Sequence, residues 1–119
     1  MIVQYAQAAL VSECMVLSHP AGAGSIPTSA GQEDFNSMGA LAALKARTVV
    51  ENASHVVASE LACACQGLEF HRPLTTTAPL EATLAEVRGR VPRIEHDRSL
   101  AHELATLARD IRLGALAPP

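Results

Sequence analysis

Apolar residues recur at helical spacing through most of this chain, and no strand-like alternation of useful length interrupts them. Residues 1–18 repeat apolar positions every three or four residues, and the His19-Pro20 step opposes further helix. Residues 38–68 continue the same period without a proline. Residues 80–113 hold two shorter helical patterns, separated by a glycine and a proline. The pattern predicts an all-α chain with one long central helix and two shorter C-terminal helices.

The predicted long helix has a polar stripe and an apolar face. The stripe comprises Lys45, Thr48, Asn52, His55 and Ser59. The opposite face comprises Ala42, Ala46, Val49, Ala53, Val56, Val57 and Ala64. A helix of about 30 residues is roughly 45 Å long, whereas a compact chain of this length is only about 35 Å across. We therefore expect the helix to protrude and to belong to an elongated helical bundle or an oligomer.

Length and composition narrow the class of protein. The chain has 119 residues, a length that favours a single segment, residues 1–119, with at most one domain. Apolar residues make up 49% of it. Alanine accounts for 22 residues while aromatics make up only 3%, a bias that favours closely packed helices. The net charge of −3 gives no reason to expect a nucleic-acid partner. Glu95 and Asp97 lie among the four arginines of residues 88–98, so we expect a solvated surface there.

The three cysteines predict neither a disulfide framework nor a metal site. Cys63 and Cys65 lie two apart in a helical pattern, so their side chains point in different directions. A lone Cys-x-Cys lacks the usual ligand spacing for zinc, and we expect both residues to be buried structural thiols. The odd count favours a reducing, cytoplasmic setting. Residues 1–17 are apolar but include glutamines, a serine and a glutamate, so we expect no membrane span.

Residues 19–37 form the candidate active-site loop between the first two predicted helices. Small and turn-forming residues dominate this loop, and such residues let the backbone fit closely around another group. Three consecutive polar side chains, Gln32, Glu33 and Asp34, follow them. Taken by itself, an acidic triplet after a loop favours the N-terminus of a helix, whose dipole attracts negative charge. Local chemistry therefore leaves open a structural role and a site role for the triplet.

Residues 25–39 resemble the loop of the histidine ammonia-lyase family, which reads Ser-Ile-Pro-Thr-Ser-Ala-Asn-Gln-Glu-Asp-His-Val-Ser-Met-Gly. The resemblance extends over nearly the whole chain and implies a C-terminal segment of such an enzyme. The family converts L-histidine to urocanate and ammonia, and its members are helical homo-oligomers. The resemblance implies that Glu33 is catalytic and that Gln32 and Glu33 bind the substrate, because a carboxylate can orient an imidazole.

The loop departs from the family pattern at three positions. Gly31 stands in place of an asparagine and Phe35 in place of a histidine. Asn36, at the next position, is more similar to the enzymes that act on other aromatic amino acids. One alternative is therefore a fragment of a related aromatic amino acid lyase or aminomutase. Another is a non-enzymatic helical oligomerisation remnant.

The resemblance also implies a cofactor, 4-methylideneimidazol-5-one, which the family forms from an internal Ala-Ser-Gly. This chain contains no Ala-Ser-Gly, and its only tyrosine, Tyr5, lies in the first predicted helix rather than in a catalytic loop. We therefore expect no cofactor in this chain and no ammonia-lyase activity from it alone. An amino acid substrate would be bound only in a complete enzyme.

Overall fold

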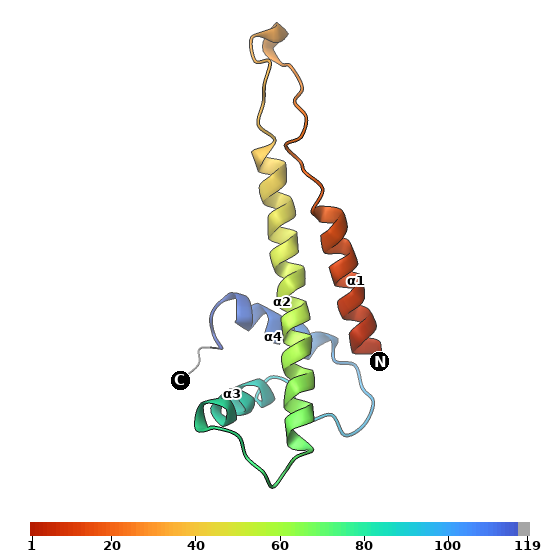
Figure 1. Cartoon of the computed structure of the whole chain (residues 1–119), viewed down its shortest axis with the longest axis vertical. Coiled ribbons are helices and arrows are strands. Elements are labelled where there is room, and N and C mark those ends of the chain that lie inside the picture. Colours follow the sequence, from red (N-terminus) through yellow and green to blue (C-terminus); the bar gives the residue numbers. More distant parts are fainter. Residues whose placement is uncertain (117–119) are drawn as a thin grey trace.

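The computed structural model describes residues 1–116 and contains no strand among them (Figure 1). Its elements are α1 (Ile2–Leu17), the 3₁₀ helix η1 (Ser29–Gly31), α2 (Gly39–Glu69), α3 (Ala78–Arg88) and α4 (Ala101–Arg112). The all-α prediction is confirmed, and the long helix predicted at 38–68 differs from α2 by one residue at each end. The two helices predicted within 80–113 are α3, which begins two residues earlier, and α4.

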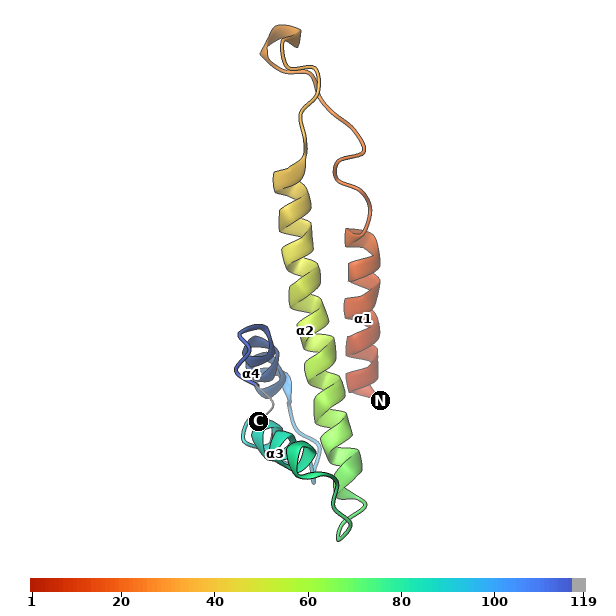
Figure 2. The same ribbon diagram turned by 60° about the vertical axis from the view of Figure 1, so that its left-hand side comes forward.

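α1 and α2 form an antiparallel hairpin, and their connecting loop extends from one end of it (Figure 1). α3 and α4 pack near the other end of α2, on the flank opposite α1 (Figure 2). The molecule measures 72 × 31 × 20 Å and has a radius of gyration of 19.9 Å, whereas a compact chain of this length has about 13.5 Å. The expectation that the long helix protrudes is therefore confirmed.

Local sequence explains how the C-terminal helices begin and end. Pro79 occupies the first turn of α3, where its missing N–H would have no intrahelical partner anyway. Gly114, with a φ of 68°, terminates α4. The Gly114 N–H donates to the Ile111 carbonyl at 3.1 Å, and the Ala115 N–H donates to the Asp110 carbonyl at 2.9 Å. These two bonds make a Schellman motif, in which glycine adopts the left-handed conformation without a Cβ clash.

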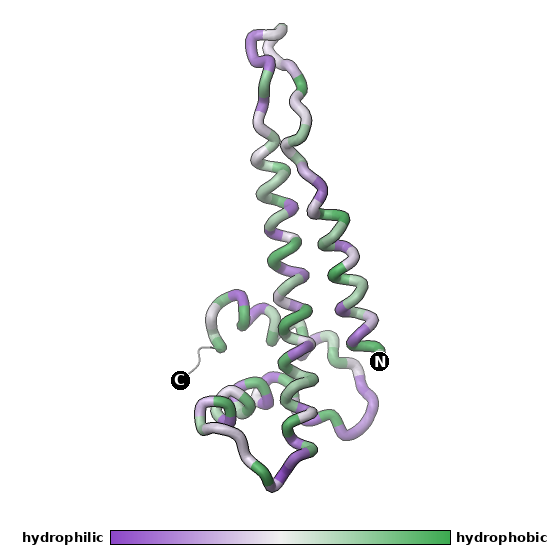
Figure 3. The backbone as a smooth tube through the Cα atoms, in the orientation of Figure 1, coloured by the Kyte–Doolittle hydropathy of each residue, from purple (hydrophilic) through white to green (hydrophobic). Residues whose placement is uncertain are grey.

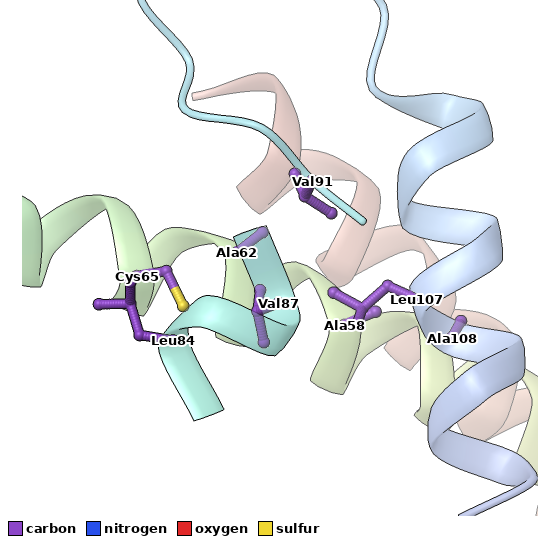
Figure 4. Packing of buried hydrophobic residues seen from close by; sticks show 8 residues of the cluster. All are labelled: Ala58, Ala62, Cys65, Leu84, Val87, Val91, Leu107 and Ala108. Atoms are coloured by element: carbon purple, nitrogen blue, oxygen red, sulfur yellow. The ribbon is translucent and has the colours of Figure 1, made fainter. Parts of the chain in front are cut away.

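A small hydrophobic cluster joins the second half of α2 to α3 and α4 (Figure 4). Its buried members are Ala58, Ala62, Cys65, Leu84, Val87, Val91, Leu107 and Ala108. The members from α2 are all small, so the other helices can approach its backbone closely. Leu107, Val87 and Val91 are the largest side chains that are fully buried, and they remove the most apolar area from water.

The two faces predicted for the long helix do not match the burial that is found along α2. Asn52 and Ser59, from the predicted polar stripe, are buried, whereas Ala53 and Val57, from the predicted apolar face, are exposed. Asn52 Nδ2 donates to Glu13 Oε2 of α1 at 2.9 Å, which satisfies the buried amide. Small polar side chains therefore lie where α2 packs against its neighbours. Hydrophobic positions recur elsewhere along α1 and α2 (Figure 3).

α1 adds no residue to the buried core. Six large apolar residues in α1 or at its start keep between 48% and 90% of their surface exposed; they are Met1, Ile2, Tyr5, Val11, Met15 and Val16. A hydrogen bond links α1 to α2, in which Gln7 Nε2 donates to the Val56 carbonyl at 3.1 Å. No helix within residues 1–116 combines the length and the apolar character needed to cross a membrane.

The arginine cluster is not a uniformly solvated surface, so that expectation is wrong for two of its members. Arg88 Nε donates to Glu69 Oε1 at 2.8 Å, which joins α3 to α2. Arg90 Nε donates to Asp110 Oδ2 at 2.7 Å, and this hydrogen bond holds the pKa of Asp110 below its ordinary value. Arg93, by contrast, is half exposed as expected. Burial differs within the cluster because Arg88 and Arg90 bond closely to carboxylates that are themselves largely buried, whereas Arg93 lies 3.8 Å from its carboxylate.

The two neighbouring cysteines of α2 have different environments. Cys65 is buried, and burial raises the pKa of its thiol, although the Arg88 guanidinium partly offsets the rise. Cys63 is exposed, so the expectation of two buried thiols is wrong for that residue. A spacing of two residues turns its side chain away from the face that packs on α3. Among the described residues, no group of His, Cys, Asp and Glu side chains is arranged to hold a metal ion.

Candidate active-site loop

The loop between α1 and α2 projects beyond the hairpin, at the end of the molecule remote from the hydrophobic cluster (Figure 1). It occupies the stretch predicted as a loop, residues 19–37. At its base the Lys45 ammonium of α2 donates to the His19 carbonyl. The Nδ1 atom of His19 lies 2.8 Å from the Val16 carbonyl of α1. These contacts attach the base of the loop to both helices.

A short antiparallel bridge closes the tip of the loop. The Thr28 N–H donates to the Glu33 carbonyl at 2.8 Å, and the Glu33 N–H donates to the Thr28 carbonyl at 3.3 Å. Between these residues, Ser29, Ala30 and Gly31 have φ angles of 52°, 54° and 86°. The left-handed conformation costs a non-glycine residue about 1–2 kcal/mol. Ser29 and Ala30 therefore carry backbone strain that the bridge sustains.

A chain of hydrogen bonds holds the Glu33 carboxylate. Thr28 Oγ1 donates to Glu33 Oε2 at 3.0 Å. Asn36 Nδ2 donates to Thr28 Oγ1 at 3.2 Å and to the Ile26 carbonyl at 2.7 Å. The Asn36 N–H donates to Ser25 Oγ at 2.6 Å. Side chains from both legs of the loop therefore belong to one hydrogen-bonded chain that ends at the carboxylate.

The second predicted site residue, Gln32, lies on the same exposed tip as Glu33. Its N–H donates to the Ser29 carbonyl at 3.2 Å, and the residue is exposed. Phe35 is 73% exposed. The tip thus presents an amide, a carboxylate and a phenyl ring to any group that packs against it.

Thr28 and Asn36 were not assigned to the site from the sequence. Both are residue types that bond loop backbone, which is the signal available in the sequence. Their link to Glu33 depends on how the turn closes. Tyr5 lies in the first turn of α1, whereas the loop follows the last turn, so the structure does not bring it to the tip.

Residues 1–89 match the family described as aromatic amino acid lyase. This chain belongs to that family. It is 49% identical to a histidine ammonia-lyase of Caenorhabditis elegans over 112 residues, which make up 94% of this chain and 16% of the relative. It is 48% identical over 116 residues to a histidine ammonia-lyase of Symbiobacterium thermophilum, covering 98% of this chain and 23% of the relative. The chain therefore spans less than a quarter of the length of these curated relatives.

A solved member of the aromatic amino acid lyase family has the same arrangement of elements. The crystal structure of histidine ammonia-lyase from Trypanosoma cruzi is similar to this chain with a TM-score of 0.91 and 46% identity. The match covers 98% of this chain and 23% of that chain. The matching segment of that longer chain therefore has a similar shape.

The precursor of the family's cofactor has no counterpart among these residues. Ser29, Ala30 and Gly31 include the same three residue types as Ala-Ser-Gly, but in a different order. Serine is then not the central residue whose side chain loses water within the new ring. The residues present do not fit the group.

Proposed function

We propose that this chain is part of a histidine ammonia-lyase and that its loop supplies Glu33 as a substrate-contacting residue. The reaction is the non-oxidative deamination of L-histidine to urocanate and ammonia. The observation that carries the proposal is an identity of 46–49% to histidine ammonia-lyases over at least 94% of the chain. The carboxylate at the exposed tip of the loop supports the assignment to Glu33.

Glu33 suits an imidazole better than a phenyl ring. An imidazole carries an N–H donor and becomes a cation near neutral pH, so a carboxylate can accept a charge-assisted hydrogen bond from it. Thr28 engages Oε2 of Glu33, which leaves Oε1 as the acceptor for the substrate. A phenyl ring has no donor for that oxygen, so the carboxylate favours histidine.

The remaining parts of the active site come from polypeptide outside these 119 residues. No Ala-Ser-Gly is present to form the electrophile that acts on the amino group. A cytoplasmic location is included in the proposal, since the three free thiols suit a reducing compartment.

Homo-oligomeric assembly is also included in the proposal. The chain exposes 8270 Å², whereas a compact monomer of its mass exposes about 6,200 Å². The large apolar residues of α1 contribute to this excess. Such a surface is typical of a segment that packs against further chain or against another subunit.

A chimera would test the role of Glu33. This chain replaces its 116-residue counterpart in the Symbiobacterium thermophilum enzyme, and kcat/KM for histidine is measured from urocanate formation. Glu33→Gln should lower that value by about 10- to 150-fold, equivalent to roughly 1.5–3 kcal/mol for a hydrogen bond to a charged group. Asp34→Asn removes the neighbouring exposed carboxylate and is the matched control, with an expected change below about twofold.

The same chimera separates the alternatives. Equal losses for histidine and phenylalanine in Glu33→Gln would contradict the imidazole contact, and no loss would remove Glu33 from the site. Phe35 and Asn36 favour a second candidate, a lyase or aminomutase for another aromatic amino acid. Turnover of phenylalanine without turnover of histidine would identify such a lyase, and release of an isomeric amino acid without ammonia would identify an aminomutase.

A non-enzymatic helical module that self-associates is the remaining candidate, and the exposed apolar residues of α1 favour it. A chimera that folds and assembles but has no activity toward any aromatic amino acid would favour this reading over the enzymatic ones.

A further inference from the structure

We infer that Thr28 and Asn36 are positioning residues that orient the Glu33 carboxylate for the substrate. The inference rests on the proposed function, because it concerns the same carboxylate. It comes from a hydrogen-bond chain in which Asn36 Nδ2 donates to Thr28 Oγ1 at 3.2 Å and Thr28 Oγ1 donates to Glu33 Oε2 at 3.0 Å.

The chemistry of the three groups sets the direction of this chain. The Asn36 atom that lies 2.7 Å from the Ile26 carbonyl must be the amide nitrogen, because two carbonyl oxygens cannot hydrogen-bond to each other. The same nitrogen therefore presents a hydrogen to Thr28 Oγ1. The single hydroxyl hydrogen of Thr28 is then directed to Glu33, whose ionised carboxylate can only accept.

The backbone bridge makes this side-chain bond effective at an exposed position. Its two N–H···O bonds already hold Thr28 and Glu33 opposite each other. The hydroxyl therefore selects among Glu33 rotamers without having to bring two segments together. A rotamer selected in advance avoids an ordering cost that substrate binding would otherwise incur.

Substitutions at Thr28 separate the hydroxyl from the shape of the side chain. In the chimera, Thr28→Val keeps the branched shape and should lower kcat/KM for histidine by about 3- to 20-fold. A loss of this size does not exceed the entropy cost of fixing a glutamate side chain in one rotamer. Thr28→Ser retains the hydroxyl and should stay within about twofold of the unmodified chimera. Asn36→Asp removes both amide donors and adds a like charge near Glu33, so its loss should equal or exceed that of Thr28→Val.

A double-mutant cycle tests whether Thr28 acts through Glu33. In a Glu33→Ala background no carboxylate remains to be oriented, so adding Thr28→Val should lower kcat/KM by less than about twofold. The full Thr28→Val loss in that background would overturn the inference, because the threonine would then act through the loop fold. If Glu33→Ala did not lower kcat/KM for histidine, the proposed function would be refuted instead.

The 119-residue chain offers a readout that does not depend on catalysis. NMR three-bond couplings of Glu33 should show one dominant χ1 rotamer in the unmodified chain and in Thr28→Ser, and averaged rotamers in Thr28→Val. The same couplings in all three proteins, whether averaged or not, would overturn the inference. This measurement decides the matter even if the chimera is inactive or fails to fold.

Discussion

Replacing Arg88 with alanine should loosen α3 from the end of α2. Arg88 Nε and Nη2 donate to the two carboxylate oxygens of Glu69 at 2.8 and 3.0 Å. Nη2 also donates to Gln66 Oε1 at 3.2 Å, and Nη1 donates to the Val91 carbonyl at 3.0 Å. Both charged side chains are only 13% exposed, so water can replace little of what the guanidinium provides.

The size of the effect follows from these contacts. A hydrogen bond to a charged group contributes about 1.5–3 kcal/mol, and removing one partner of a buried ion pair costs about 3–5 kcal/mol. Because this pair keeps some contact with water, Arg88→Ala should lower the free energy of unfolding by about 3 kcal/mol. Arg88→Lys keeps the charge but loses the two-pronged geometry, and should cost about 1–2 kcal/mol.

The same pair predicts a dependence of stability on pH. The hydrogen bond from Arg88 holds the pKa of Glu69 below its ordinary value. The unfolded chain therefore binds this proton more tightly than the folded chain does. The stability that the pair provides is present above the ordinary glutamate pKa and is lost as the pH falls through the lowered folded-state pKa. The difference in unfolding free energy between the unmodified chain and Arg88→Ala should shrink accordingly in acid.

Urea unfolding followed by circular dichroism measures these differences, at a concentration where sedimentation shows one assembly state for all variants. Arg93→Ala is the control, because Arg93 Nε lies 3.8 Å from Glu69 and its side chain is 50% exposed. That substitution should change the free energy of unfolding by less than about 0.5 kcal/mol. Equal midpoints for Arg88→Ala and Arg93→Ala, or an Arg88→Ala effect that does not vary with pH, would refute the reasoning.

Three further outcomes are expected. Leu107→Ala should lower the free energy of unfolding by about 2–5 kcal/mol because Leu107 is fully buried. In the same urea experiment Leu113→Ala is the control, and it should change that free energy by less than about 0.5 kcal/mol because Leu113 is 72% exposed. The 119-residue chain should self-associate through the exposed apolar surface of α1, which sedimentation velocity will detect; a monomer whose unfolding is independent of concentration would contradict this. The chain alone should form no urocanate from histidine, and a rise in ultraviolet absorbance with purified protein would show that the missing tripeptide is not required.

The positions of the helices and of the loop were determined by the sequence itself. Helical periodicity is carried by residues close together in the chain, and the breaks at Pro20 and Pro73 are equally local. For this reason α2 could be predicted to within one residue at each end. The run of small residues before Glu33 likewise identified the loop without knowledge of any distant contact.

Burial and pairing were decided only by the tertiary structure. Asn52 is buried because Glu13, 39 residues away, accepts its amide hydrogen. Arg88 becomes part of the interior because Glu69 lies at the end of the helix on which α3 packs. The hydrogen bond to the Glu33 carboxylate likewise forms only because the turn brings Thr28 opposite that residue. Periodicity shows which residues share a face of a helix, but the segment that packs against that face decides whether a polar residue finds a partner there.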